Sequence, residues 1–315
     1  MEGGKLYVYD STFIENFANG SLSTVWAGSG GSISNCLFQG NRAVRSATTG
    51  IQMLTSGIYG SSDTTVDACS FVANSASLTM TDGNQHGAAS GMVYSGHRPR
   101  MVNCTFYGNT AEATTSGDPS QTVAGTVVAH SSNTYGFLAH CSFSENVAPD
   151  GDFVLLNPDA IRSQNVYNSI FWNRAPDYVP ISRVGSGQFA IFNSTVKGWE
   201  TVPAWVTASS AISAVDPSYG RLRSINDRLV VPLGGFSPVR NAGLDILFDA
   251  NGVHVYDSAA GSGTPVYKRC DTMAAHTPAQ PVFQIPDAFG ALRQSGKISL
   301  GAVQAAGGST LLSIR

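Results

Sequence analysis

The chain has 315 residues and a formal net charge of −3, and charged residues make up only 12% of it. This charge gives no electrostatic basis for nucleic-acid binding, and no apolar run of 18 residues is present that would span a membrane. The 34 glycines favour a fold with many tight turns.

One short phrase recurs along the first 180 residues: Ser or Cys, one further residue, Phe, and then Asn and Ala. The copies begin at Ser11, Cys36, Cys69, Cys104, Cys141 and Ser169, and a degraded seventh begins at Ser194. Their asparagines are Asn16, Asn41, Asn74, Asn109, Asn146 and Asn173, which lie 25 to 37 residues apart. Self-similarity of this kind indicates stacked structural units.

The sequence of each unit is typical of short β-strands. The first alternating run spans residues 5–9, and the repeated phrase follows it as a second strand. Apolar runs at 24–26, 50–54, 91–94, 125–128 and 152–156, and others at 65–67, 100–102, 136–138 and 165–167, complete the units. Three strands per unit predict an all-β fold, the right-handed parallel β-helix, with neighbouring coils about 4.8 Å apart.

Stacking places equivalent side chains above one another. We expect an inward column of Phe and an inward column of Cys and Ser, two residues apart on one strand face. The asparagines are predicted to line a sharp turn, to take left-handed backbone angles, and to hydrogen-bond from coil to coil. A β-propeller needs blades of roughly 40–50 residues, and a horseshoe needs a leucine consensus, so both fit less well.

The cysteines favour packing over chemistry. Four of five occupy the inward column, and the paired spacing typical of zinc sites is missing. The run Asp249-Ala250-Asn251-Gly252 resembles half of a calcium loop, but the remaining ligands are absent and a turn is favoured. The sequence therefore predicts neither a metal nor a cofactor.

The repeat fades near residue 198. We therefore assign residues 1–199 to β-helix coils, and residues 200–315 to irregular final coils and a C-terminal cap of the same solenoid. The tail carries Asp216-Pro217, Ser237-Pro238, Asn241-Ala242-Gly243, Asp287 to Arg293 and Gly301-Ala302.

In this order, the coils and tail motifs resemble secreted bacterial right-handed β-helix proteins of the pectin-lyase-like superfamily. The group often labelled choice-of-anchor Q domain proteins is the most similar, although Ser299 stands where that group often has an acidic residue. The resemblance implies a secreted or cell-surface location. The superfamily includes polysaccharide lyases, glycoside hydrolases, adhesins and autotransporter passengers, so the resemblance selects no activity.

The first coil begins without a cap, because residues 1–4 lead directly into a strand. An uncapped solenoid end exposes apolar surface and strand edges. We expect that a preceding domain or a partner covers this coil, or that the chain is a fragment.

Alignment of the middle strands of three coils suggests a binding edge. Its members are Tyr94, His97, Arg98, His130, Asp159 and Arg162. His97, His130 and Asp159 would form an acid/base group, while Tyr94 and Arg98 would hold a sugar or a carboxylate. The alternative is that these are ordinary polar turn residues. The four tryptophans, Trp26, Trp172, Trp199 and Trp205, are either sugar-stacking platforms or packing residues.

Neither catalytic pattern common on this fold is clear. Lyases need a basic residue beside a calcium-holding acidic cluster, and hydrolases need paired aspartates on successive coils. We therefore expect a scaffold or adhesin-type protein that contacts a polysaccharide on one flank. The alternative is a polysaccharide-degrading lyase or glycoside hydrolase.

Overall fold

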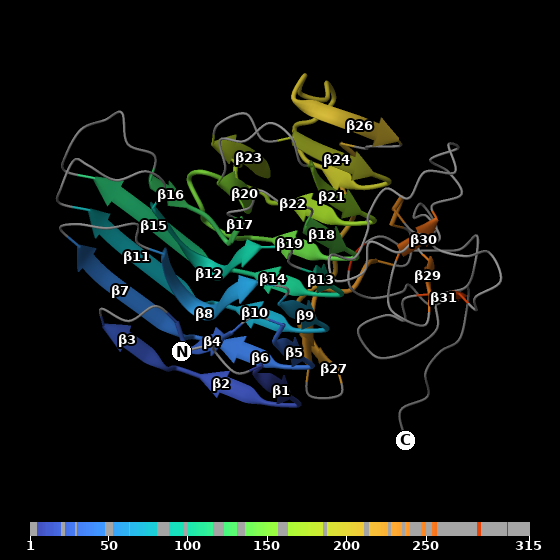
Figure 1. Cartoon of the computed structure of the whole chain (residues 1–315). Coiled ribbons are helices and arrows are strands. Elements are labelled where there is room, and N and C mark those ends of the chain that lie inside the picture. The colour runs from blue at the N-terminus through green and yellow to red at the C-terminus, as the bar shows by residue number, and fades with distance from the viewer. Residues whose placement is uncertain are drawn as a thin grey trace.

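Thirty-one β-strands and no helix occupy the described part of the computed structural model (Figure 1). The structure describes residues 5–19, 23–28, 30–47, 53–62, 64–80, 88–97, 100–115, 123–130, 136–156, 163–184, 188–210, 214–225, 228–234, 237–239, 247–249, 254–256, 282–284 and 301. Within these residues, no helix is long and apolar enough to cross a membrane.

Four parallel sheets, named A to D, run along the solenoid. Sheet A contains β1 (Tyr7–Tyr9), β5 (Ser32–Ser34), β9 (Thr65–Asp67), β13 (Arg100–Val102), β18 (Gly136–Ala139), β21 (Ser163–Tyr167), β24 (Gln188–Phe192) and β26 (Val206–Ser210). Sheet B contains β2 (Thr12–Ile14), β6 (Leu37–Gln39), β10 (Ser70–Val72), β14 (Thr105–Tyr107), β19 (Ser142–Ser144), β22 (Ile170–Trp172) and β25 (Thr195–Val196).

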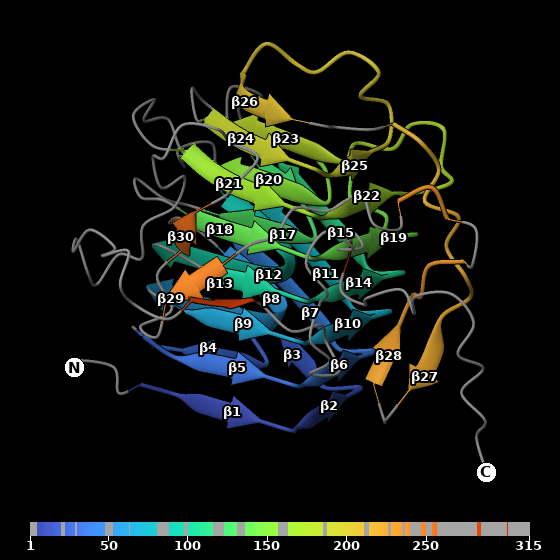
Figure 2. The same cartoon turned by 90° about the vertical axis from the view of Figure 1, so that its right-hand side faces the viewer.

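Sheets C and D close the coils. Sheet C contains β3 (Phe17–Asn19), β7 (Arg42–Ala47), β11 (Ser75–Met80) and β15 (Thr110–Thr115). Sheet D contains β4 (Val25–Ala27), β8 (Met53–Ser62), β12 (Ala88–His97), β16 (Val123–Gly125), β17 (Val128–His130), β20 (Phe153–Leu156) and β23 (Ile181–Val184). Each coil visits the sheets in turn and then pairs with the coil before it, so the predicted parallel β-helix is confirmed (Figure 2).

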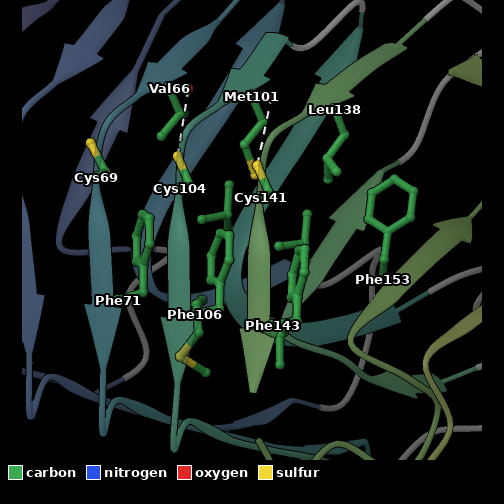
Figure 3. Packing of buried hydrophobic residues seen from close by; sticks show 14 of the residues in the cluster. Val66, Cys69, Phe71, Met101, Cys104, Phe106, Leu138, Cys141, Phe143 and Phe153 are labelled. Atoms are coloured by element: carbon green, nitrogen blue, oxygen red, sulfur yellow. Dashed lines mark hydrogen bonds between the residues drawn. The ribbon is translucent and has the colours of Figure 1, made fainter. Parts of the chain in front are cut away.

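The predicted Phe column is the centre of the core. Its members are in register on sheet B: Phe13, Phe38, Phe71, Phe106, Phe143 and Phe171. Neighbouring rings are stacked, with centroids 4.6 to 4.8 Å apart, and every ring after Phe13 is fully buried (Figure 3). The stack follows the strand spacing, so each coil contributes one ring.

The Cys and Ser column is also confirmed as inward, and all of its members after Ser11 are buried. The four described thiols are free, and the sulfur of Cys104 lies 3.3 Å from the carbonyl oxygen of Val102, two residues earlier. Ser169 makes the same contact, donating its hydroxyl to the carbonyl of Tyr167 at 2.8 Å. Cys and Ser can share the column because both side chains donate to this turn carbonyl.

The asparagines form the predicted ladder. The backbone N–H and the side-chain Nδ2 of Asn74 both donate to Oδ1 of Asn109, each at 3.0 Å. Nδ2 of Asn74 also donates to the carbonyl of Phe38 at 2.9 Å. The same pattern links Asn41 to Asn74 and Asn109 to Asn146, so buried amides are satisfied from coil to coil.

The prediction of left-handed backbone angles at these asparagines is wrong by one residue. The residue before each of the first five asparagines has positive φ instead: Glu15 (53°), Gly40 (63°), Ala73 (52°), Gly108 (63°) and Glu145 (55°). The left-handed residue turns the chain, and the asparagine after it is then free to point inward and hydrogen-bond. At the turn from sheet A to sheet B, asparagines do take this conformation, as at Asn35 and Asn103.

Sheet C was not predicted. The first four coils therefore contribute to all four sheets, because the chain continues as a strand after the asparagine. The alternation in β11 was the available signal, since Ala76, Leu78 and Met80 are buried and the residues between them are not. Beyond β15, the described chain joins sheet B to sheet D without a sheet C strand.

The described part of the tail returns along the outside of sheet B. An antiparallel hairpin joins β27 (Arg223–Ile225) to β28 (Arg228–Val230), and β28 lies against β10 (Figure 2). Val239, Tyr219 and Leu233 pack on Ile170. Outward residues of the covered coils are buried, among them Thr105. The boundary between coils and cap at residue 199 stays a prediction.

A short antiparallel sheet contains the last described strands, β29 (Leu247–Asp249), β30 (His254–Tyr256) and β31 (Val282–Gln284). At the C-terminal end of the core, Trp199 and Trp205 meet edge to face with centroids 5.6 Å apart. The Arg183 guanidinium lies 5.5 Å from the Trp205 ring centroid. Both tryptophans therefore act in packing.

Candidate functional site

The predicted binding edge is only partly described. Arg98, Asp159 and Arg162 lie outside the described residues, as does the side chain of His97, which pairs with Ser62 at the end of β12. Tyr94 and His130 are described, and they lie on different faces of sheet D. This separation follows from the register, which pairs Tyr94 with Ala129 and Ser95 with His130.

His130 faces the core. Its side chain is 1% exposed, and its ring meets Phe153 edge to face at a centroid distance of 5.2 Å. A polysaccharide on the outer surface does not reach this position. The acid/base role assigned to His97, His130 and Asp159 stays a prediction, and the geometry places its central member on the inner side of the sheet.

Tyr94 belongs to an outward aromatic column on sheet D that sequence reasoning did not assemble. Trp26, Tyr59 and Tyr94 are in register on β4, β8 and β12. Trp26 meets Tyr59 edge to face at 6.3 Å, and the rings of Tyr59 and Tyr94 are tilted at 4.8 Å. We call these three residues the aromatic column. Trp26 and Tyr94 each follow an inward valine of a predicted apolar run, but Tyr59 lies beyond the predicted run at 50–54, so the predicted runs alone did not reveal the column.

Exposure changes along the aromatic column. Trp26 is 65% exposed, Tyr59 is half-buried, and Tyr94 is 8% exposed and packs with Met53 and Ala129. Burial raises the pKa of Tyr59 above its ordinary value, so its hydroxyl stays neutral and can donate a hydrogen bond. The column therefore presents an open ring at one end and a packed support at the other.

Among the residues whose side chains are described, the outward neighbours of the aromatic column along sheet D are uncharged. The outward neighbours along the described strands of sheet D include Ser61 on β8, Ala129 on β17 and Val154 on β20. Aromatic faces beside small and hydroxyl-bearing residues suit an uncharged amphipathic ligand, since such a ligand needs both apolar contact and hydrogen bonds.

A second feature is a buried carboxyl group in coil five. Asp152 precedes β20, is 1% exposed, and accepts a hydrogen bond from the hydroxyl of Tyr178. Burial raises the pKa of Asp152 to about 7, and hydrogen bonds from Tyr178 and Asn146 partly offset the rise. The group lies inside the protein, away from the aromatic column, so we assign its effect to stability.

Substitution of Asp152 by Asn should remove most of the pH dependence of stability that this carboxyl causes. Its pKa is raised in the folded state, so the folded protein binds the proton more tightly than the unfolded chain. The unfolding free energy of the wild type should therefore fall as pH rises from 3.8, the ordinary pKa of an aspartate, towards about 7, by up to roughly 4 kcal/mol. Urea unfolding at pH 5 and pH 8 measures this difference. An equal pH dependence in Asp152→Asn would refute the assignment.

Metal binding finds no support in the described residues, which contain no group of three or more His, Cys, Asp or Glu side chains able to hold an ion. Of the half calcium loop, only Asp249 is described, and it ends β29. The rest of that loop, Ala250 to Gly252, lies outside the described residues.

Comparisons with known proteins do not assign a function, so the function is argued from the geometry of the chain itself. No family model, no curated protein and no solved structure matches the chain. What is established is a parallel β-helix with an outward aromatic column on one flank, of which Trp26 is exposed.

Proposed function

We propose that this protein is a secreted or cell-surface β-helix scaffold of the pectin-lyase-like type that binds a linear polysaccharide without cleaving it. The polysaccharide lies against the outer face of sheet D. The aromatic column is the observation that supports this proposal, and the resemblance of the coils and tail to secreted β-helix proteins supports the location.

Aromatic rings are suitable contacts for sugars because their faces pack against the apolar C–H faces of pyranose rings. Trp26 offers such a face, and the Tyr59 hydroxyl adds a donor beside it. Consecutive members lie one coil apart, so a ligand that follows the column runs parallel to the solenoid axis. A linear polymer suits that arrangement better than a compact molecule.

Cleavage is the less supported alternative. Hydrolysis of a glycosidic bond needs two ionisable groups that flank the bond on an accessible surface. Of the described titratable groups near this region, His130 faces the core and Asp152 is buried. Neither reaches a ligand on the outer face of sheet D.

A panel of neutral and acidic linear polysaccharides tests the proposal, with binding followed by affinity electrophoresis and cleavage followed by release of reducing ends. We expect at least one polysaccharide to retard the native protein while its reducing ends stay constant, with or without calcium. An increase in reducing ends would favour the enzyme. No retardation by any member of a broad panel would contradict the scaffold proposal.

A further inference from the structure

A long antiparallel hairpin lies on the outer face of sheet B. Its two legs are joined by backbone hydrogen bonds, from Gly220 to the carbonyl of Pro232 at 2.8 Å and from Gly234 to the carbonyl of Ser218 at 2.9 Å, and the pairing continues through β27 and β28. We call residues 217–234 the hairpin arm. Within the described residues, its strands pair with each other and with no strand of the solenoid, so its main-chain pairing is internal.

The hairpin arm connects coils that are not neighbours. At its base, Tyr219 and Leu233 pack on Ile170 of coil six, and near its tip β28 lies against β10 of coil three (Figure 2). Val230 of β28 and Val72 of β10 are both buried. The coils of a solenoid otherwise contact only their neighbours, so the arm is a separate structural element that crosses several of them.

The face on which the hairpin arm lies is mainly polar. One outward row of sheet B is in register from coil three to coil seven, and every member of it is at most 4% exposed: Ser70, Thr105, Ser142, Ile170 and Thr195. Four of these five side chains carry a hydroxyl group. Burial of an apolar side chain is favourable, whereas burial of a hydroxyl group is not favourable in itself. The composition of this face therefore suits contact with water as well as contact with the arm.

A second tail segment docks at the base of the hairpin arm. The N–H of Gly301 donates to the carbonyl of Asn168 at 2.7 Å, and a Cβ at this position would lie 2.5 Å from Oγ of Ser142 and 3.1 Å from Cδ1 of Ile170. The φ angle of Gly301 is 82°, in the left-handed region. Glycine is required here both for the backbone angle and for the close approach. Ile170 thus lies against both Tyr219 of the arm and Gly301.

We propose that the hairpin arm is a strap that undocks from sheet B as a unit while the coils stay folded, and that the segment at Gly301 keeps it docked. The internal pairing of the arm is kept in both states, and the hydroxyl groups that it uncovers are compatible with water. Each coil keeps its own strand pairing, so undocking requires less free energy than the unfolding of a coil. The undocked state presents a second flank of the solenoid, lined by Ser70, Thr105 and Ser142. The inference does not depend on polysaccharide binding, because it concerns sheet B and not sheet D.

Thiol labelling of the folded, whole protein tests this inference. The reporter is Thr105→Cys, combined with Cys104→Ser so that the neighbouring thiol is removed, since serine already occupies the same column at Ser169. The internal reference is Cys141, which is fully buried in the next coil and is reached only when that coil unfolds. We expect iodoacetamide to label the introduced thiol at least about a hundredfold faster than Cys141, as measured by mass spectrometry of the digested protein.

Thr12→Cys provides the labelling rate of an uncovered position in the same row. Thr12 is exposed, and it pairs with Leu37, which pairs in turn with Ser70. The thiol introduced at Thr105 should be labelled at least about tenfold more slowly than this reference, because it is accessible only in the undocked state.

Gly301→Ala should favour the undocked state, because the added methyl group meets Ser142 and Ile170. We expect it to raise the ratio of labelling at position 105 to labelling of Cys141 by at least about tenfold. Gly198→Ala is the matched control. Gly198 has a similar φ of 79°, but nothing lies within 4 Å of its Cβ position, so this variant has the backbone strain without the contact and should leave the ratio unchanged.

Three results would overturn the inference. Equal labelling of the introduced thiol and of Cys141 would show that the arm leaves sheet B only when the coils unfold. A rate at position 105 equal to that of Thr12→Cys would show that the arm does not cover the row in solution. Equal ratios in Gly301→Ala and Gly198→Ala would show that the segment at Gly301 does not hold the arm.

Discussion

Replacement of Asn109 by Ala should lower the unfolding free energy by about 2–6 kcal/mol. The change leaves the buried N–H of Asn74 without its acceptor, and Nδ2 of Asn74 keeps only the carbonyl of Phe38. It also removes the Nδ2 group of Asn109, which donates to the carbonyl of Phe71 and to Oδ1 of Asn146, while the backbone N–H bond to Asn146 is kept. Buried polar groups that lose their partners cost more than the bond itself contributes, so the effect should exceed that of a surface substitution.

Asn16→Ala is the matched control for this prediction. Asn16 is exposed at the end of the ladder, and no described residue donates to its Oδ1. Its loss should therefore cost at most about 1 kcal/mol. Urea unfolding of both variants measures the difference, and equal losses would show that the ladder does not stabilise the inner coils through satisfied amides.

Phe106→Ala should lower the unfolding free energy by about 3–5 kcal/mol. The ring is fully buried and stacks on Phe71 at 4.8 Å and on Phe143 at 4.6 Å, so its removal leaves a cavity between two rings (Figure 3). The surrounding coils are held by their own strand pairing and can collapse only in part.

Phe13→Ala, at the end of the Phe column, is the matched control for this prediction. Phe13→Ala removes a ring that stacks on one side only, so the loss should be less than half as large. Each coil contacts only its neighbours, and the two substitutions should therefore add when combined. A cost for Phe13→Ala equal to that for Phe106→Ala would contradict the stacked core as the main source of stability.

The columns were predictable because they repeat. Phe, Cys or Ser, and Asn recur at fixed offsets within the phrase, and the inward face of a three-residue strand follows from its alternation. The same packing requirement applies in every coil, so the inward position inferred for Phe38 also holds for Phe143.

Sheet C and the position of the left-handed turn residue were harder to predict from the sequence. Sheet C follows the asparagine in only four coils, and its inward residues vary from Ala43 to Leu78. The turn residue before the asparagine also varies, from Glu15 to Gly108, since several residue types tolerate the left-handed conformation at a modest cost. Neither feature requires the same residue type in every coil, so neither appears as a repeated residue in the sequence.

The candidate site depended on register, which the sequence does not specify between coils of unequal length. Tyr94 pairs with Ala129, so the alignment that placed His130 beside His97 is displaced by two residues. A displacement of two residues leaves the face unchanged, so the face is decided by strand alternation alone, in which neighbouring residues point to opposite sides. His130 faces the core for this reason, while Trp26 and Tyr59 join Tyr94 on the outside.

The outer surfaces of the solenoid are not equivalent. The hairpin of β27 and β28 covers part of sheet B, whereas sheet D keeps Trp26 open at the N-terminal end of its outer face. A rigid solenoid holds such a column in fixed spacing, because each ring is attached to a strand that is paired on both sides or packed on the core. This rigidity is the physical link between the fold and the proposed binding flank.

The most direct measurement is the affinity of Trp26→Ala for a polysaccharide that binds the wild type, compared with Tyr9→Ala. Both residues are exposed aromatics of the first coil, but Trp26 lies on sheet D and Tyr9 on sheet A. We predict that Trp26→Ala weakens binding by about tenfold or more, or about 1.4 kcal/mol, and that Tyr9→Ala leaves binding unchanged. Unchanged binding in Trp26→Ala, or an equal loss in both variants, would contradict the assignment of the site to sheet D.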